Sequence, residues 1–296
     1  MTPQKRRAPR LCRRVSLSLL LPCGLIALVA VGRPAAAKAA EPDSVSSDVE
    51  YARVGDVRLT LDAHVPAGDG PFATCILVHG GGFTKGDKHS FIKPLFEPLS
   101  QAGFTWFTID YRLAPEHRWP ACAEDVGAAV RWVKAHASQY KVDPARIALV
   151  GESAGGHLVS WVGVRSEPGT EVAAVVPFYA PHDLELQVRR RGQPGESMTA
   201  LLGLTELNDD AYARLRSASP ATYVRPQLPP FLLISGDKDA AVAIEQSEQF
   251  REKMLAAGNV CDLIVIPGGA HGMGSWDKLG SDYKTRLVDW LKKTLR

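Results

Sequence analysis

The pentapeptide at residues 151–155 constrains the fold of this chain more than any other segment. It reads Gly-Glu-Ser-Ala-Gly and stands between an apolar, strand-like run and a helix-like run. A sharp strand-to-helix turn with a glycine on each side exposes the central serine, as nucleophilic catalysis requires. An ordinary glycine-rich turn has the same composition, so the pentapeptide alone does not decide between the two. Ser153 is therefore a candidate nucleophile that needs partners elsewhere in the chain.

A second glycine-rich segment, His-Gly-Gly-Gly-Phe at residues 79–83, follows another strand-like run. In acyl transfer, a backbone N–H group that points at the developing oxyanion contributes on the order of 3 kcal/mol. Glycine lets the backbone approach a substrate closely, so Gly81 and Gly82 are candidate donors, with the N–H of Ala154 as the third. His79 is expected to fix this loop. A Walker-type phosphate loop is excluded, since no Lys-Ser or Lys-Thr pair follows the glycines.

A general base and a carboxylate are expected to follow the serine in chain order. His271 lies on a glycine-rich loop after a late strand-like run and is the candidate base. Asp239 follows the strand-like run 231–235 and lies past a tight turn, so it is the candidate carboxylate that orients the histidine. Asp237 is the alternative carboxylate, and its other role would be to cap the turn. His157, on the helix after the serine, is expected to be a hydrogen-bonded core residue rather than a second base.

These motifs resemble those of α/β-hydrolase esterases of the hormone-sensitive-lipase-like type, and more closely those of the bacterial acetyl-xylan and feruloyl esterase-like group. The resemblance extends over about residues 50–296 and rests on segments 79–83, 110–121, 142–147, 151–158, 235–239 and 270–272. It implies a Ser-His-Asp serine esterase without a metal or other cofactor, in which position 239 holds the triad acid. The departure is Ser235, where the family often has histidine, at a position that orients the turn.

The tract at residues 110–120 is predicted to support the glycine-rich loop and one wall of a substrate pocket. Asp110 and Arg112 are expected to form a buried ion pair that holds this tract in place. Trp119 is predicted to bind substrate together with Phe83, although packing in the core would also suit its large apolar ring.

Residues 1–39 have the pattern of a secretory signal peptide, with a basic start, an apolar run over 15–31 and then alanine-rich cleavage sites. Two arginines before the apolar run weakly indicate twin-arginine export. The competing interpretation is an uncleaved membrane anchor, but Pro22 and Gly24 interrupt a stretch that is short for a span. We expect cleavage near Ala39, a periplasmic or secreted mature protein, and no stable membrane insertion after cleavage.

Cleavage would change the sign of the net charge. The whole chain has 35 Lys and Arg against 32 Asp and Glu, for a net charge of +3. Residues 1–39 hold 8 of the basic residues and none of the acidic ones, which leaves 27 against 32 and a net charge of −5. A nucleic-acid partner therefore has no support. Cys75, Cys122 and Cys261 also remain, and we expect them to be buried thiols rather than the basis of a disulfide-built fold.

Strand-like and helix-like runs alternate from residue 50 onward. This alternation predicts a mostly parallel, twisted sheet with helices on both faces, in the α/β class. The expected strands are 50–65, as an antiparallel start, and 76–79, 104–110, 147–150, 173–179, 231–235 and 263–266. The expected helices are 121–137, 154–165, 243–257 and 282–295.

The predicted domain organisation is a signal peptide at residues 1–39, a short polar linker at 40–49 and an α/β-hydrolase catalytic domain at 50–296. The segment 184–226 breaks the strand and helix alternation. It is polar, carries three consecutive arginines and contains a short helical stretch, so it is predicted to form a small cap inserted in the domain.

Three functions compete at this point. The first is a carboxylesterase that hydrolyses short acyl esters, including acetyl esters of plant polysaccharide, so that the partner is a small ester or an acylated saccharide. The second is an amide hydrolase, formamidase-like or peptidase-like, because the same triad serves both reactions. The third, a non-catalytic binding module, is disfavoured because every motif that the reaction needs is intact. The sequence predicts no oligomeric state.

Overall fold

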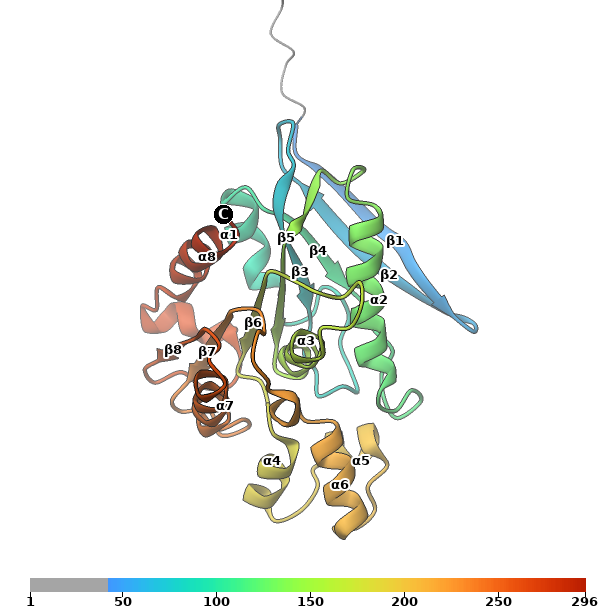
Figure 1. Cartoon of the computed structure of the whole chain (residues 1–296), viewed down its shortest axis with the longest axis vertical. Helices are drawn as coiled ribbons and strands as arrows, with labels where there is room; N and C mark the ends of the chain where they lie inside the picture. Colours follow the sequence, from blue (N-terminus) through green and yellow to red (C-terminus); the bar gives the residue numbers. More distant parts are fainter. Residues whose placement is uncertain (1–41) are drawn as a thin grey trace, which may run out of the picture. The chain divides into compact units, whose positions relative to one another are not determined.

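The computed structural model describes residues 42–296, so the predicted signal peptide lies outside the described residues. Within this part, the strands form one eight-stranded sheet in the order β1-β2-β4-β3-β5-β6-β7-β8 (Figure 1). Strands β3 to β8 run parallel, and the β1–β2 hairpin joins β4 in antiparallel orientation. The strands are β1 (Ser44–Val54), β2 (Val57–Val65), β3 (Phe72–Val78), β4 (Thr105–Ile109), β5 (Val142–Glu152), β6 (Ala174–Phe178), β7 (Phe231–Gly236) and β8 (Cys261–Ile266).

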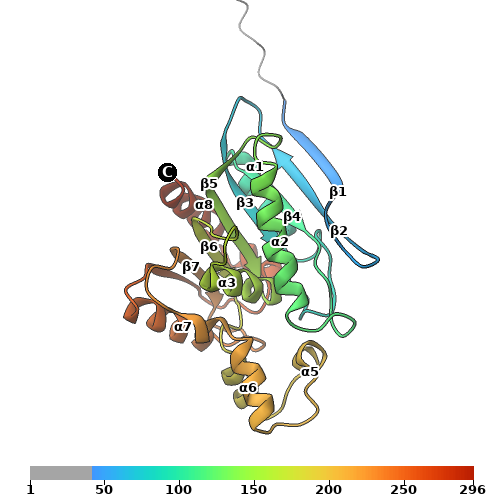
Figure 2. The ribbon, with the colours of Figure 1, turned by 45° about the vertical axis from the view of Figure 1, so that its right-hand side comes forward.

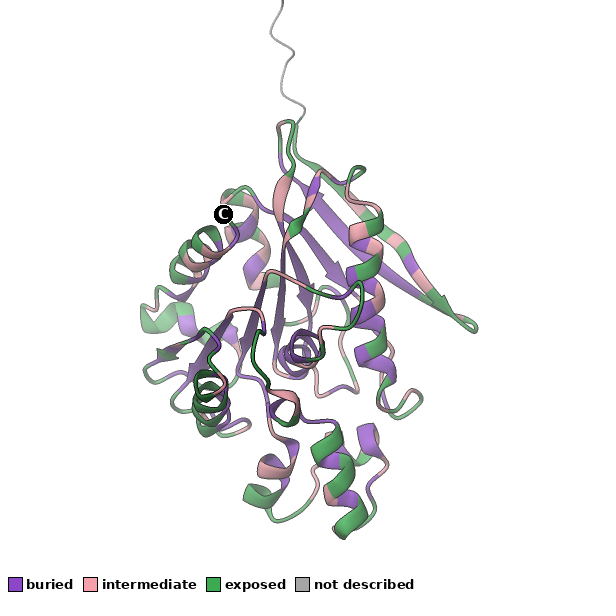
Figure 3. Ribbon diagram, viewed as in Figure 1, coloured by how far each residue is buried: buried purple, intermediate pink, exposed green. Residues whose placement is uncertain are grey.

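Helices cover both faces of the sheet, as predicted. One core cluster lies under α2 (Ala121–Ala135), α3 (Ala154–Arg165) and α7 (Glu245–Ala256). A second cluster, on the other face, lies under α1 (Phe96–Gln101) and α8 (Tyr283–Thr294), where Leu287, Leu291 and Leu295 are buried. Strands β4, β6 and β7 are buried along their whole length, which is typical of parallel strands covered on both sides (Figure 3).

The first strand begins earlier than the sequence predicts. β1 pairs with β2 from Ser44 onward, so the second half of the expected linker at 40–49 belongs to the sheet. Most side chains of β1 are exposed because it is the edge strand of the sheet. Its polar composition therefore resembles that of a linker, although its backbone pairs with that of β2.

The expected ion pair between Asp110 and Arg112 does not form. Arg112 instead pairs with Asp125 of α2, with Nη2 at 2.7 Å from Oδ1. Asp110 faces the buried Lys88, whose Nζ lies 3.4 Å from its Oδ2 and 2.6 Å from Oδ1 of Asp48. A buried ammonium needs such partners. Lys88 thereby anchors the segment after the glycine-rich loop to the first hairpin.

The cap comprises more helix than expected. Between β6 and β7 lie α4 (Leu184–Arg191), α5 (Glu196–Leu202), α6 (Asp209–Ser217) and the 3₁₀ turn at Pro220–Tyr223. The side chains of Asp183 and Asn208 accept hydrogen bonds from backbone N–H groups in the first turns of α4 and α6, as good N-caps do. The three helices lie together beyond one end of the sheet (Figures 1 and 2).

The three cysteines of the described chain are buried and free, as predicted. Burial raises the pKa of the Cys75 and Cys122 thiols, which keeps them protonated and unreactive. Across residues 42–296, no helix combines the length and apolarity needed to cross a bilayer.

Candidate active site

Ser153 stands at the turn between β5 and α3 in a strained conformation, with φ 52° and ψ −116°. Its N–H donates to the carbonyl oxygen of Phe178 on the neighbouring strand, at 2.9 Å. A Cβ on Gly155 would lie 2.2 Å from the carbonyl oxygen of Val78, so only glycine fits there. The pentapeptide therefore forms the sharp turn that the sequence predicts, and the turn presents the serine at the end of the sheet.

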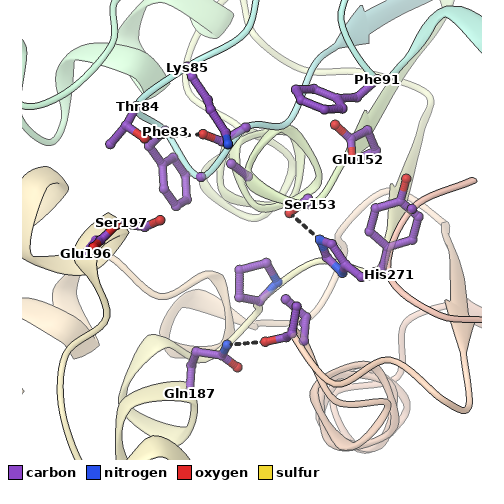
Figure 4. A pocket seen from close by; sticks show the side chains of 18 of the residues that line it. Phe83, Thr84, Lys85, Phe91, Glu152, Ser153, Gln187, Glu196, Ser197 and His271 are labelled. Carbon is purple, nitrogen blue, oxygen red and sulfur yellow. Dashed lines mark hydrogen bonds between the residues drawn. The ribbon is translucent and has the colours of Figure 1, made fainter.

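Ser153, His271 and Asp239 form one hydrogen-bonded chain. Figure 4 shows the contact between Ser153 and His271. Nε2 of His271 lies 2.9 Å from Oγ of Ser153, and Nδ1 lies 2.6 Å from Oδ2 of Asp239. The other carboxylate oxygen of Asp239 accepts from the N–H groups of Ala241 and Val242, at 2.8 and 2.9 Å. The acid is buried and fully bonded, whereas the imidazole stays partly exposed. This is the geometry of a nucleophile, a base and an orienting acid.

Asp237, the alternative acid, does not contact His271. Its Oδ1 accepts a hydrogen bond of 2.7 Å from the N–H of Gly268, on the loop that carries the histidine. Asp237 therefore links two neighbouring loops instead of capping its own turn.

The candidate oxyanion donors Gly81, Gly82 and Ala154 line the same cavity as Ser153. Gly81 and Gly82 have φ angles of 98° and 63°, which favour glycine. A Cβ on Gly81 would lie 1.9 Å from the carbonyl oxygen of Lys85. The loop at residues 79–83, hereafter the glycine loop, thus depends on glycine for its shape.

His79 holds the glycine loop in place, as predicted. The residue is buried, and its Nδ1 donates to the carbonyl oxygen of Gly80 at 2.8 Å. Its ring stacks on Tyr111 with a centroid distance of 4.3 Å. The Tyr111 hydroxyl also donates to the carbonyl oxygens of His79 and Gly80. The tract after β4 therefore supports the glycine loop, as the sequence indicates.

The cavity around Ser153, hereafter the cleft, has a volume of about 790 Å³. Figure 4 shows Glu152 and Phe91 on one side of the serine and residues of α5 on the other. The sequence offered no motif for most of its walls. The lining residues that sequence reasoning missed include Lys85, Phe91, Glu152, Tyr179, Gln187, Arg191, Glu196, Ser197, Met198 and Met273.

Of the two expected substrate-binding residues, only Phe83 lines the cleft. Trp119 packs edge-on against His157 and Trp161, with centroid distances of 5.7 and 5.1 Å. Its backbone N–H donates to the carbonyl oxygen of Leu201 in the cap. Of the two interpretations of Trp119, the structure favours packing, because its partly buried ring lies against α3 and the core.

Glu152, directly before the nucleophile, is a buried carboxyl group in the wall of the cleft. Burial raises its pKa to about 7, while the Tyr179 hydroxyl, the Gly80 N–H and the charge of His271 oppose that rise. A Cβ on Gly80 would lie 2.0 Å from its Oε1, so the side chain packs directly on the glycine loop. Its position within the pentapeptide was the only signal in the sequence.

His157 and His182 are fully buried near the cleft. Nδ1 of His157 donates to the carbonyl oxygen of Pro181 at 2.7 Å, which confirms the predicted core role. The His182 ring stacks on Phe250, and within residues 42–296 neither of its nitrogens has a hydrogen-bond partner. Burial lowers the pKa of His157 to about 4 and that of His182 to about 3. Both rings are therefore neutral in the folded protein.

We expect these two histidines to make the protein sensitive to acid. Below about pH 6.5 the unfolded chain binds protons at these positions and the folded chain does not, so stability falls as pH falls. Each histidine should contribute roughly 1.4 kcal/mol per pH unit between about pH 6 and its folded pKa. Urea unfolding at pH 5.5 and 4.5 should show a shallower pH dependence for His182→Leu than for the wild type. Equal slopes would contradict this account.

Known proteins resemble this chain in sequence. The family model described as BD-FAE matches residues 61–254. A probable carboxylic ester hydrolase of Mycobacterium tuberculosis, LipM, is 35% identical over 190 residues, which are 60% of this chain and 43% of LipM. An ethyl acetate hydrolase of Pseudomonas putida is 28% identical over 278 residues, covering 88% of this chain and 86% of the hydrolase. The chain spans about half the length of the mycobacterial relatives that it matches.

Solved structures of similar proteins extend over most of the chain. A truncated carbohydrate esterase from gut microbiota superposes with a TM-score of 0.76 at 26% identity, over 85% of this chain and 96% of that esterase. Esterase 2 of Thermogutta terrifontis, in a butyrate-bound structure, gives a TM-score of 0.68 at 26% identity, over 83% and 92% of the two chains. These likenesses agree with the α/β-hydrolase fold expected from the sequence.

Proposed function

The chain belongs to the BD-FAE family, and from that membership we propose that it is a serine carboxylesterase that hydrolyses short-chain acyl esters. The observation that carries the proposal is the hydrogen-bonded chain of Ser153, His271 and Asp239, of which Ser153 and His271 line the cleft. Relatives named as carboxylic ester hydrolases and esterases support the same reaction. The matching sequence covers nearly the whole ethyl acetate hydrolase.

The proposed reaction has two halves. Oγ of Ser153 attacks the ester carbonyl carbon while Nε2 of His271 takes the hydroxyl proton, and Asp239 stabilises the imidazolium that forms. The N–H groups of Gly81, Gly82 and Ala154 receive the oxyanion. His271 then returns the proton to the alcohol oxygen as its bond to the acyl carbon breaks. Water, deprotonated by the same imidazole, then attacks the acyl carbon. The bond from that carbon to Oγ of Ser153 breaks, His271 returns the proton to Oγ, and the acid is released.

The side chains that line the cleft suit an ester with a short acyl group and a polar alcohol. Glu196 and Ser197, on α5, bring polar side chains from the cap. Phe91, on the opposite side, is half exposed and offers an apolar surface. A saccharide alcohol would find hydrogen-bonding groups on the cap side, and the likeness to a carbohydrate esterase supports an acetylated saccharide as substrate.

We expect kcat/KM to peak with acetyl to butyryl esters and to fall beyond about six carbons. Each methylene that fits an apolar pocket adds about 0.8 kcal/mol of binding, and chains that the pocket does not hold gain nothing further. The cap has three short helices with many charged residues and offers little apolar cover for a long chain. Hydrolysis of p-nitrophenyl esters from two to twelve carbons measures the profile, and a rate that keeps rising to ten carbons would indicate a lipase instead.

A second panel separates ester from amide hydrolysis. Acetylated xylan, p-nitrophenyl acetate and an aryl formamide should be compared at equal enzyme concentration. Release of acetate from the first two, with at most slow turnover of the amide, is the expected result. Faster turnover of the formamide would assign the chain to amide hydrolysis and overturn the proposal.

We further propose that the protein is exported and acts in the periplasm or outside the cell. The basic, apolar and alanine-rich pattern of residues 1–39 supports this location. The N-terminal sequence of the protein recovered from the cell envelope or medium should begin near Ala40. Recovery of a membrane-bound form with an intact N-terminus would contradict it.

A further inference from the structure

Two side chains of the cap helix α4 meet at one backbone carbonyl of the loop that carries the candidate acid. Nε2 of Gln187 donates to the carbonyl oxygen of Ala241 at 2.7 Å. Nη2 of Arg191 donates to the same oxygen at 2.8 Å. Figure 4 shows Gln187 in this contact at the edge of the cleft.

The same peptide group contacts Asp239 on its other side. The carbonyl of Ala241 and the N–H of Val242 belong to one planar peptide unit, in which the two groups point in opposite directions when the bond is trans. The N–H of Val242 donates to Oδ1 of Asp239 at 2.9 Å, and Oδ2 of Asp239 contacts His271. One peptide unit therefore connects a guanidinium in the cap to the carboxylate of the triad.

We propose that Gln187 and Arg191 are positioning residues that orient Asp239 through the Ala241–Val242 peptide group. Donors on a peptide oxygen polarise the group and strengthen the hydrogen bond that its N–H gives. The positive charge of Arg191 adds to this effect, because the two hydrogen bonds connect it through the peptide group to the negative charge of Asp239. The cap thereby acts on the base through the acid, without contact to the reacting atoms. The inference rests on the proposed triad.

Arg191 is held differently from its neighbours on α4. Arg190 pairs with Glu245 at the surface, and both of those side chains are about half exposed. The guanidinium of Arg191 lies instead against the start of α5, where a Cβ on Gly195 would be 2.8 Å from Nη1. The lack of a side chain at Gly195 leaves room for Arg191 to reach Ala241, on the loop that carries Asp239. Arg190 therefore provides a matched control, with the same charge one residue away.

The test compares Gln187→Met, Arg191→Met, their combination and the control Arg190→Met, all in the full-length protein. With p-nitrophenyl acetate, we expect each of the first two variants to lower kcat about tenfold with little change in KM, since misplacing a catalytic group by about 1 Å lowers the rate by up to about a hundredfold. The double variant should lose more, Arg191→Lys should recover most of the rate, and Arg190→Met should match the wild type. Thermal unfolding checks that each variant is folded.

The outcomes are separable. If KM rises while kcat stays constant, the side chains contact substrate, and the proposal is overturned. Unchanged kinetics in the double variant would also overturn it. The rate at which a small fluorophosphonate labels Ser153 is measured in parallel, because it reports serine activation without any ester. A wild type that is labelled but hydrolyses no ester would refute the proposed function, while the labelling rates of the variants would still test the positioning role.

Discussion

We expect Ser153→Ala to lower ester hydrolysis by about a million-fold, which would leave only background turnover. The hydroxyl oxygen is the atom that bonds to the acyl carbon, and it lies 2.9 Å from Nε2 of His271. Among the described residues, no other side chain is hydrogen-bonded to that nitrogen. The change removes one oxygen and leaves the N–H bond to Phe178 intact. The variant should therefore fold like the wild type, which circular dichroism and thermal unfolding can check.

Ser160→Ala provides the matched control. Ser160 lies on α3, is buried, and its Oγ donates to the carbonyl oxygen of Gly156 at 2.7 Å. Its replacement should leave kcat/KM nearly unchanged, with at most a modest loss of stability. Substantial activity in folded Ser153→Ala would show that another group is the nucleophile.

The second large effect is expected for Asp239→Asn, with a loss of about 10⁴-fold in kcat. The carboxylate accepts from Nδ1 of His271, and this contact fixes the tautomer that leaves Nε2 free to take the serine proton. An amide lacks the negative charge that stabilises the imidazolium. The amide NH₂ group is also a donor, and it would replace one of two oxygens that now accept from the N–H groups of Ala241 and Val242 or contact His271.

Asp237→Asn should be much milder, because Asp237 bonds to the backbone of Gly268 and not to the imidazole. An asparagine can still accept that hydrogen bond through its side-chain oxygen. Steady-state kinetics of the two variants, measured side by side, decide between the two acids. If Asp237→Asn were the more damaging change, the assignment of Asp239 would be wrong.

The sequence predicts the fold class well because parallel strands with helices on both faces leave a clear pattern. β6 and β7 are nearly continuous apolar runs, and the glycines at 151 and 155 fit only one kind of turn. The sequence also predicts that the candidate residues lie close together, since loops at the carboxyl ends of parallel strands meet at one edge of a sheet. The catalytic roles of Ser153, His271 and Asp239 stay predictions until variants are measured.

What the sequence did not predict depends on long-range partners. Arg112 pairs with Asp125 and Glu124 rather than with Asp110, and only the approach of α2 decides this choice. From the sequence, Trp119 suited either the wall of the substrate pocket or the core, and only its contact with Trp161 of α3 distinguishes the two. Gln187 and Ala241 lie 54 residues apart, and no periodicity connects a cap side chain to a loop carbonyl.

The separation of the triad along the chain also bears on how the protein reaches its native state. Ser153 and His271 are 118 residues apart in sequence, and Asp239 and His271 are 32 apart. Closing such long loops is entropically unfavourable until the strands between them have paired, and non-local pairing is slow compared with helix formation. Recovery of hydrolysis after dilution from denaturant should therefore trail recovery of the helical signal. The rate of hydrolysis therefore reports only those molecules in which β5, β7 and β8 have all paired in the native sheet.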